Sequence, residues 1–204
     1  EKVYLDIATW KTLPIRQISS GLAETIKHAC IASKDFFDYL NIHMNEIYNI
    51  DKSVCEHVAK ENCKIKYDVV MKDEKENGLR EVLNLGHTVG RAIETVSGYK
   101  LLHGEALSIG IVAEVKLAYR LGYMTEGQRD DVITLLKKAN LPTAIPSYID
   151  RENLVKKLYT DKKVKNGQLR FVIQNGIGNV VEFYEGVYAT KIEENVAREI
   201  ISKM

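Results

Sequence analysis

Residues 106–113 form a segment that is apolar on every side when it is drawn as a helix. The segment reads Ala-Leu-Ser-Ile-Gly-Ile-Val-Ala and lies between Glu105 and Glu114, which we interpret as its polar ends. A helix without a polar face has to be buried inside a fold. The segment is also much shorter than the ~20 apolar residues that a membrane-spanning helix needs. The sequence therefore predicts a globular fold around a central buried helix and no association with a membrane.

The composition narrows the class of protein further. The 204 residues include 29 basic and 28 acidic side chains with no basic block, which excludes a dedicated nucleic-acid-binding protein. A chain of this length can bury a sufficient core as one domain without disulfides or a structural metal. No Cys-x-x-Cys pair is present, so we interpret Cys30, Cys55 and Cys63 as small buried hydrophobic residues. Because no secretory leader opens the chain, we expect an intracellular, cytoplasmic protein.

The first residues suggest a piece of a longer chain. Glu1 stands where a complete chain has Met, and residues 3–7 have the composition of a strand already in progress. Ser19, Ser20 and Gly21 then supply an N-cap signal for a first helix.

Helical periodicity dominates the remainder. Near the C-terminus, residues 168–174 and 179–184 have strand composition and flank the turn sequence Asn-Gly-Ile-Gly, which predicts a β-hairpin. The predicted fold class is therefore mainly α, one multi-helical domain with a small β-hairpin near the C-terminus. We expect helices over residues 22–32, 35–50, 51–70, 79–96, 102–121, 127–139, 151–159 and 189–202.

The predicted helix over residues 79–96 carries a polar stripe. Arg80, Asn84, His87 and Arg91 are spaced i, i+4, i+7 and i+11, which places them on one side of a helix, opposite a row of apolar residues. An ordinary amphipathic helix with one face in water shows the same periodicity. However, the centre of the stripe lacks Glu and Lys, and two glycines flank it although each costs ~1 kcal/mol relative to alanine. The stripe also suits a binding surface for an anionic, hydroxylated ligand.

His103 stands at the first turn of the predicted central helix. The N-terminus of a buried helix carries a positive partial charge, which disfavours a protonated imidazole. A neutral imidazole is the form that binds a metal ion. We interpret His103 either as a metal ligand or as a helix-start histidine that is hydrogen-bonded to a loop.

Glu24 and Lys27 lie three residues apart on the first predicted helix. Such a pair is typical of a surface salt bridge worth ~0.5 kcal/mol or less. Glu24 and His28, four residues apart, could instead chelate a metal, although the second histidine of a zincin helix is missing. His43 and His57 have no partner at ligand spacing, so we interpret them as surface or core residues.

A basic loop precedes the predicted hairpin and contains Lys162, Lys163 and Lys165. The loop is either a solvated segment or one that closes over a phosphate group. No glycine-rich nucleotide-binding motif is present in the chain, so we do not expect the chain itself to bind a nucleotide.

Two motifs closely resemble the 3-dehydroquinate synthase family. Residues 83–94 read Leu-Asn-Leu-Gly-His-Thr-Val-Gly-Arg-Ala-Ile-Glu, and residues 102–106 read Leu-His-Gly-Glu-Ala. The resemblance covers nearly the whole chain in order, but it concerns only the C-terminal, helical domain of that family. It implies that residues 1–204 are the metal- and substrate-binding domain and that the N-terminal NAD-binding domain is absent from this chain. Shorter matches occur at residues 12–14, 21–27, 73–80 and 161–163.

The resemblance also implies a role for particular residues. A divalent metal, usually Zn²⁺ but alternatively Co²⁺, would be held by Glu24, His87 and His103. A set of one glutamate and two histidines leaves a coordination position open, as a catalytic zinc requires. The residues that match catalytic positions are Lys27, Glu76, Arg80 and Asn84. Those that match substrate-binding positions are Lys27, Lys66, Arg80, Asn84, Arg91 and Lys162.

The reaction implied is that of a phosphate-eliminating, metal- and NAD-dependent cyclase. It converts 3-deoxy-D-arabino-heptulosonate 7-phosphate into 3-dehydroquinate in the shikimate pathway of aromatic amino-acid biosynthesis. The expected partners are this sugar phosphate, the N-terminal NAD-binding domain of the same enzyme and, at full length, a second copy in a homodimer. The isolated chain is expected to be inactive because it lacks the domain that binds NAD.

Arg91 departs from the family's pattern, which has a second histidine four residues after His87. An arginine binds phosphate bidentately, but it cannot exchange protons as histidine does. This difference leaves open which sugar phosphate is the substrate, and three alternatives stand beside a 3-dehydroquinate synthase. They are a related sugar-phosphate cyclase of the 2-deoxy-scyllo-inosose or epi-valiolone synthase type, a helical binding domain without activity, and a metal-dependent alcohol dehydrogenase of related architecture.

Overall fold

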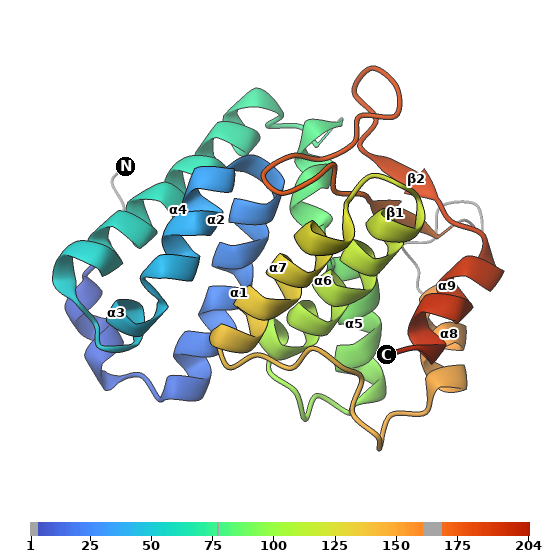
Figure 1. Cartoon of the computed structure of the whole chain (residues 1–204), viewed down its shortest axis with the longest axis horizontal. Helices are drawn as coiled ribbons and strands as arrows, with labels where there is room; N and C mark the ends of the chain where they lie inside the picture. Colours follow the sequence, from blue (N-terminus) through green and yellow to red (C-terminus); the bar gives the residue numbers. More distant parts are fainter. Residues whose placement is uncertain (1–3, 77, 161–168) are drawn as a thin grey trace.

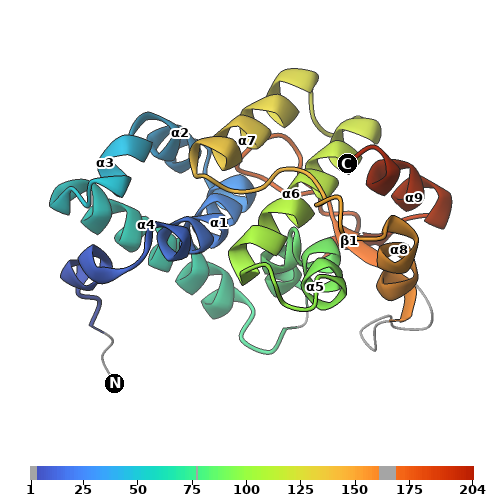
Figure 2. The same cartoon turned by 90° about the horizontal axis from the view of Figure 1, so that it is seen from below.

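Helix α6 (His103–Arg120) runs through the centre of the fold. Its residues from Ala106 to Leu117 are buried with the single exception of Lys116, and it packs against α1, α5, α7 and α9. The prediction of a central buried helix is thus confirmed. Figures 1 and 2 show α6 between the N-terminal helices and the C-terminal part of the chain. The computed structural model describes residues 4–76, 78–160 and 169–204.

The other elements lie in three groups, one on each side of α6 and one packed beside it (Figures 1 and 2). On one side lie a short 3₁₀ helix, η1 (Ile7–Thr12), and helices α1 (Ile15–Ala32), α2 (Lys34–Ile42), α3 (Met44–Tyr48) and α4 (Lys52–Lys72). Helices α5 (His87–Val96) and α7 (Glu126–Lys138) pack against α6 itself, and a second 3₁₀ helix, η2 (Leu79–Asn84), contacts α1, α4 and β1. On the other side lie α8 (Arg151–Thr160), β1 (Arg170–Val172), β2 (Ala189–Lys191) and α9 (Glu194–Ser202).

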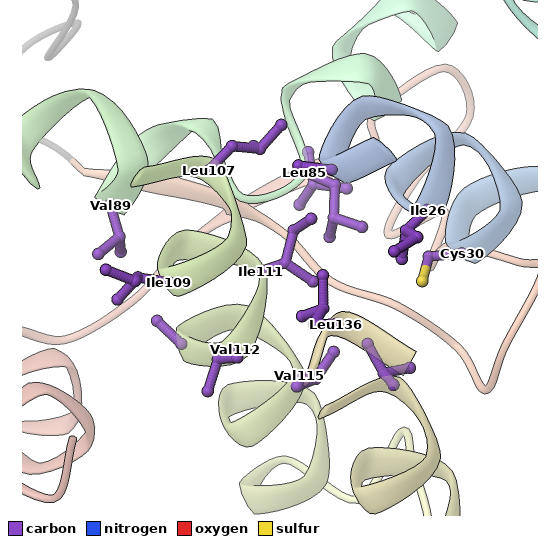
Figure 3. Packing of buried hydrophobic residues seen from close by; sticks show 14 of the residues in the cluster. Ile26, Cys30, Leu85, Val89, Leu107, Ile109, Ile111, Val112, Val115 and Leu136 are labelled. Carbon is purple, nitrogen blue, oxygen red and sulfur yellow. The ribbon is translucent and has the colours of Figure 1, made fainter. Parts of the chain in front are cut away.

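One contiguous hydrophobic core joins these groups (Figure 3). In Figure 3, Ile111 of α6 points towards Leu85, and Val89 of α5 lies beside Ile109 of α6. Helix α1 contributes Ile26 from the other side, which is fully buried. The prediction of a mainly α fold with a small antiparallel β-hairpin is confirmed.

The predicted helix over residues 79–96 is wrong as a single element. It divides into η2 and α5 because Gly86, between them, adopts a left-handed conformation with φ +76°. A side chain at this position would also collide with Leu107 and Ile111 of α6. The polar stripe therefore does not lie along one straight helix, although hydrophobic periodicity continues across the break.

Two other predicted helices and the predicted first strand also differ from the structure. Helix α1 begins at Ile15 behind Pro14, so the expected N-cap at residues 19–21 lies inside it. The predicted helix over residues 35–50 is interrupted at His43, where α2 ends and α3 begins. In the described part of the predicted first strand, Asp6 instead caps η1 by accepting a hydrogen bond from the Ala8 amide at 2.9 Å.

The hairpin pairs with a different partner from the one predicted. Strand β1 pairs with β2 in the register Arg170–Lys191, Phe171–Thr190 and Val172–Ala189. The predicted return strand over residues 179–184 instead makes a single β-bridge with the residues that follow β1, between Val180 and Gln174. The turn between these two residues is bound to α1, since the Gly178 amide donates a hydrogen bond to the Cys30 carbonyl oxygen at 2.9 Å. Residues 189–191 are thus extended, and the last helix begins at Glu194 rather than at residue 189.

Two predictions of burial are wrong as well. Cys30 and Cys55 are buried as expected, but Cys63 is exposed beside an apolar groove between α1, α4 and η1. Glu114 was expected to be a polar end of the apolar segment, but it is fully buried. No helix in residues 4–76, 78–160 and 169–204 is both long and apolar enough to cross a membrane.

The substitution Gly110→Ala tests how closely α6 approaches the turn at Gly86, between η2 and α5. A Cβ atom at Gly110 would overlap the Gly86 carbonyl oxygen and lie 2.8 Å from the Gly90 nitrogen, both of them backbone atoms. We expect Gly110→Ala to lower the free energy of unfolding by about 3 kcal/mol or more, measured by urea denaturation. Gly21→Ala is the matched control, because nothing lies within 4 Å of its Cβ position on α1. It should stabilise the protein by about 0.5–1 kcal/mol through helix propensity. Equal effects of the two substitutions would contradict this account of the crossing.

Candidate metal centre

Three side chains from three helices meet at one point. Glu24 of α1 places its Oε1 atom 3.4 Å from Nε2 of His87 and 3.0 Å from Nε2 of His103. His87 and His103 are the first residues of α5 and α6, and their ring centroids lie 5.4 Å apart. One ligand atom from each residue lies within 4.8 Å of the others. The structure thus brings together the three residues that the sequence comparison with the family placed around a metal.

The approach of α1 to α6 sets Glu24 opposite His103. Gly104 has no side chain, which allows the Ser20 carbonyl of α1 to come directly against it. The Ser20 hydroxyl oxygen also accepts a hydrogen bond from the Gly104 amide at 3.0 Å. Because Glu24 lies one helical turn after Ser20, its carboxylate projects towards the neighbouring His103.

A salt bridge fixes the same two helices at their N-termini. Arg16 donates to both carboxylate oxygens of Glu105, at 2.6 and 2.7 Å. Glu105 also accepts a hydrogen bond from the Leu102 amide at 2.8 Å, which caps the start of α6. His103 therefore lies between Leu102 and Gly104, whose backbone amides both donate hydrogen bonds to side chains.

The second nitrogen of each imidazole also has an acceptor. Nδ1 of His87 lies 3.2 Å from the Leu85 carbonyl oxygen, and Nδ1 of His103 lies 3.0 Å from the Glu94 carboxylate. Histidines that bind metal ions usually donate their other ring N–H to such an acceptor, which fixes the ring and leaves the opposite nitrogen for the ion. Sequence reasoning missed the contact made by Glu94. The sequence signal that could have revealed Glu94 is its spacing of seven residues from His87, which places both on the same face of α5.

The charges around Glu24 favour its ionised form. Burial opposes ionisation, but the contacts with His87, Lys27 and His103 outweigh it and lower the pKa of Glu24. Lys27 is 4% exposed and donates to the second Glu24 oxygen at 2.6 Å, so the pair is not the surface salt bridge of the default interpretation.

The prediction that the helix N-terminus keeps His103 neutral is wrong. The His103 side chain is 48% exposed, so its imidazole is not enclosed in the protein. Burial lowers the pKa of His103, but the hydrogen bonds to Glu24 and Glu94 outweigh it and raise the pKa. The carboxylates of Glu24 and Glu94 therefore favour the protonated form of this imidazole, whereas burial opposes it.

Basic residues border the three ligands. Burial lowers the pKa of Lys27, and the positive charges of Lys66 and Arg91 lower it further while Glu24 opposes them. Lys66 lies exposed on α4, and Arg91 lies one turn after His87 on α5. These three cations would attract an anionic ligand to the same place.

The remaining predicted residues lie on the segment that leads into His87. Arg80 of η2 pairs with Glu76 at 3.0 Å and donates to the Glu74 carbonyl at 3.3 Å. Asn84 is exposed at the end of η2, immediately before the turn. Lys162 and the other basic residues of its loop lie outside the described residues.

His28 does not join Glu24 as a ligand. It is buried and points to α4, where its Nδ1 atom lies 2.6 Å from Oδ1 of Asn62. His43 and His57 lie near Tyr39, with ring centroids 4.3 and 4.2 Å from it, which agrees with their interpretation as surface or core residues.

The three groups fit a divalent ion such as Zn²⁺. One carboxylate and two imidazoles form the donor set of a three-ligand catalytic zinc site. Ligands of a tetrahedral zinc ion with bonds of ~2.0–2.1 Å are separated by about 3.3 Å. The separations of 3.4 and 3.0 Å between Glu24 and the two histidines are close to that value.

Solved structures with the same fold are sugar-phosphate cyclases. A 2-epi-5-epi-valiolone synthase from Streptomyces hygroscopicus, with NAD⁺ and Zn²⁺ bound, matches 97% of this chain and 54% of its own at 22% identity and a TM-score of 0.84. A 2-deoxy-scyllo-inosose synthase complexed with carbaglucose-6-phosphate, NAD⁺ and Co²⁺ matches 94% of this chain and 53% of its own at 25% identity and a TM-score of 0.79. The fold is therefore that of the helical half of these enzymes.

The sequence comparisons identify the family. The 3-dehydroquinate synthase C-terminal family matches residues 21–164, and the chain belongs to this family rather than to the alcohol dehydrogenases. The 3-dehydroquinate synthase of Ruminiclostridium cellulolyticum is 44% identical over 180 residues, which are 88% of this chain and 50% of that protein. The one from Acetivibrio thermocellus is 39% identical over 203 residues, 99% of this chain and 54% of that protein. The chain spans about half the length of these relatives.

Because His28 is enclosed, it should make the stability of the protein depend on pH. Burial, together with the charge of Lys27, lowers its pKa from 6.5 to about 4. The unfolded chain therefore binds this proton first, so the contribution of neutral His28 is present above pH 6.5 and lost progressively towards pH 4. Between about pH 7 and pH 4.5, we expect the wild type to lose about 2 kcal/mol more stability than His28→Gln, measured by urea denaturation. Parallel losses in the two proteins would contradict this assignment.

Proposed function

We propose that this chain is the metal- and substrate-binding half of a 3-dehydroquinate synthase. The whole enzyme would convert 3-deoxy-D-arabino-heptulosonate 7-phosphate into 3-dehydroquinate and release phosphate. The observation that carries the proposal is the meeting of Glu24, His87 and His103 beside a buried lysine, in a chain of this family.

The proposed division of labour follows from what these residues offer. Glu24, His87 and His103 would hold the divalent ion, with Glu94 and the Leu85 carbonyl orienting the two imidazoles. When bound, such an ion supplies Lewis-acid polarisation of a substrate hydroxyl and lowers its pKa. We assign NAD to the half of the relatives that this chain does not cover, which the family resemblance implies is an N-terminal domain.

The cations would bind the acidic groups of the substrate. Lys27 contacts the metal ligand Glu24, and Lys66 and Arg91 lie near enough to Lys27 for their charges to lower its pKa. Charge-assisted hydrogen bonds from such groups hold carboxylates and phosphates. Arg80, Asn84 and Glu76 lie on the chain segment that precedes His87, and we propose that they contact the hydroxyl groups and the carboxylate of the substrate. Lys162 would complete the set from its loop.

Arg91 supports a second candidate function, that of a related sugar-phosphate cyclase. Its guanidinium can bind phosphate through two parallel hydrogen bonds and stays charged, but it cannot transfer a proton as the family's histidine can. Turnover of 3-deoxy-D-arabino-heptulosonate 7-phosphate by the full-length protein would support the first proposal. Turnover of another sugar phosphate in its place would support the second.

The family resemblance further suggests a homodimer and a cytoplasmic location for the whole enzyme. A helical binding domain without activity remains the non-enzymatic alternative. It predicts no stoichiometric metal, which separates it from both enzymatic candidates.

Metal binding tests the proposed centre directly. We expect the chain to bind one Co²⁺ or Zn²⁺ ion, and His87→Ala or His103→Ala to weaken binding by about 100-fold or more, because each removes one of three ligands. Isothermal titration with the metal-free protein measures this. His43→Ala is the matched control, since this histidine lies beside Tyr39 outside the cluster. Stoichiometric metal in His87→Ala would overturn the assignment of ligands.

Arg91 tests the proposed phosphate contact. In the full-length protein, Arg91→Ala should raise KM for the sugar phosphate by about 10-fold or more, because a charge-assisted contact contributes about 1.5–3 kcal/mol. Steady-state kinetics measure the effect. Arg120→Ala provides the comparison, because this arginine lies near Glu199 at the far end of α6. A KM that Arg91→Ala leaves unchanged would remove Arg91 from the substrate site.

A further inference from the structure

Glu114 is a buried carboxyl group that the proposed mechanism does not use. It lies on α6 with an exposed fraction of 0%, between the apolar residues Ala113 and Val115. One oxygen, Oε2, accepts a hydrogen bond from the Gly86 amide at 2.7 Å. The other oxygen, Oε1, has no hydrogen-bond partner among the described residues. Because buried polar atoms without partners are rare in folded proteins, this group needs an explanation.

The position of Glu114 on α6 directs it to the turn before His87. Gly110 and Glu114 are four residues apart and face the same way. The missing side chain of Gly110 admits the Gly86 carbonyl against the helix, and Glu114 reaches the Gly86 amide one turn further on. Helix α6 therefore contacts Gly86 at its carbonyl group, through Gly110, and at its amide group, through Glu114.

The peptide group between Leu85 and Gly86 connects Glu114 with His87. Its N–H donates to Glu114, and its carbonyl oxygen lies 3.2 Å from His87 Nδ1. Both contacts belong to one rigid plane, because a peptide unit is planar. Two hydrogen bonds, joined by this peptide, thus link the Glu114 carboxyl group to Nδ1 of His87, whose other ring nitrogen, Nε2, lies beside Glu24.

The turn that contains this peptide has a second possible orientation. Leu85 has φ −50° and ψ 129°, and Gly86 has φ 76° and ψ −18°, which are the angles of a type II turn. Rotation of the central peptide by about 180° gives a type I turn, which any residue, including glycine, can adopt. That rotation would turn the carbonyl away from His87 and towards Glu114.

We propose that Glu114 is a positioning residue for His87, holding the Leu85–Gly86 peptide so that its carbonyl accepts from Nδ1 and leaves Nε2 for the metal ion. This inference rests on the proposed metal centre. Glu114 acts only through the peptide and touches neither the ion nor the substrate.

The surroundings of Glu114 indicate which property of the side chain matters. Burial raises its pKa well above the ordinary value, although the hydrogen bond from Gly86 opposes this. The turn is contacted by one oxygen, Oε2, which accepts the hydrogen bond from the Gly86 amide, and an acceptor oxygen does not need a negative charge to do this. An amide of the same length should replace the carboxyl group, whereas an apolar side chain of similar size should not.

Co²⁺ affinity of the metal-free chain separates positioning from simple filling of space. We expect Glu114→Gln to bind Co²⁺ within about threefold of the wild type, and Glu114→Met to bind 10- to 100-fold more weakly, the usual effect of losing an outer partner of a metal ligand. Ser108→Ala is the control, because Ser108 is equally buried on α6 but donates to the Pro142 carbonyl, away from the turn. It should lose stability without losing affinity.

The outcomes distinguish this inference from the function on which it rests. A wild-type chain that binds no Co²⁺ would overturn both. Binding by the wild type and equally tight binding by folded Glu114→Met would overturn only the role of Glu114. Circular dichroism reports whether each variant is folded.

A second measurement covers the case in which Glu114→Met does not fold. In Zn²⁺-loaded protein, nuclear magnetic resonance should show a proton on His87 Nδ1 whose chemical shift changes in Glu114→Gln, because hydrogen bonds in a chain polarise one another. The Nδ1 proton of His103, which faces Glu94, serves as the internal reference and should not move. A His87 proton that also stays in place would overturn the inference.

Discussion

The close crossing of α6 over its neighbours is the constraint on which the rest of the structure depends. At Gly104, α6 meets the backbone of α1, and at Gly110 it meets the backbone of the turn before α5. Neither approach leaves room for a side chain, so the three elements have one relative placement. Because Glu24, His87 and His103 each lie within a turn of such a contact, their side chains are oriented by backbone packing rather than by loops.

Much of the fold follows from local patterns. The apolar segment over residues 106–113 predicted its own burial, and hydrophobic periodicity predicted most of the helices. The interruption at Gly86 was not predictable in this way, because apolar residues continue at helical spacing on both sides of it. The reason for the interruption is long-range: Leu107 and Ile111 of α6 occupy the space that a side chain at Gly86 would need. The partner of β1 was missed for the same reason, since contacts with Cys30 fix the intervening turn.

The same difference between local patterns and long-range contacts applies to the candidate site. Family resemblance, and not spacing, suggested Glu24, His87 and His103, which are separated by up to 79 residues in the sequence. Their roles, and those of the surrounding cations, stay predictions. Residues that act through a neighbour were not found at all. Glu94 and Glu114 read as ordinary helix glutamates, and only the fold shows that one faces His103 and that the other is enclosed beneath a turn.

The spread of the three ligands along the polypeptide has a thermodynamic consequence. An ion held jointly by α1, α5 and α6 would act as a crosslink between the N-terminal and central helices, closing a loop of 79 residues. Such an ion has little affinity for the unfolded chain, in which these groups are far apart, so its binding energy would add to the folding energy. The stability of the fold against denaturation would then increase with the occupancy of the metal site. A shortage of the ion would leave the protein less stable as well as without the ion at its candidate site.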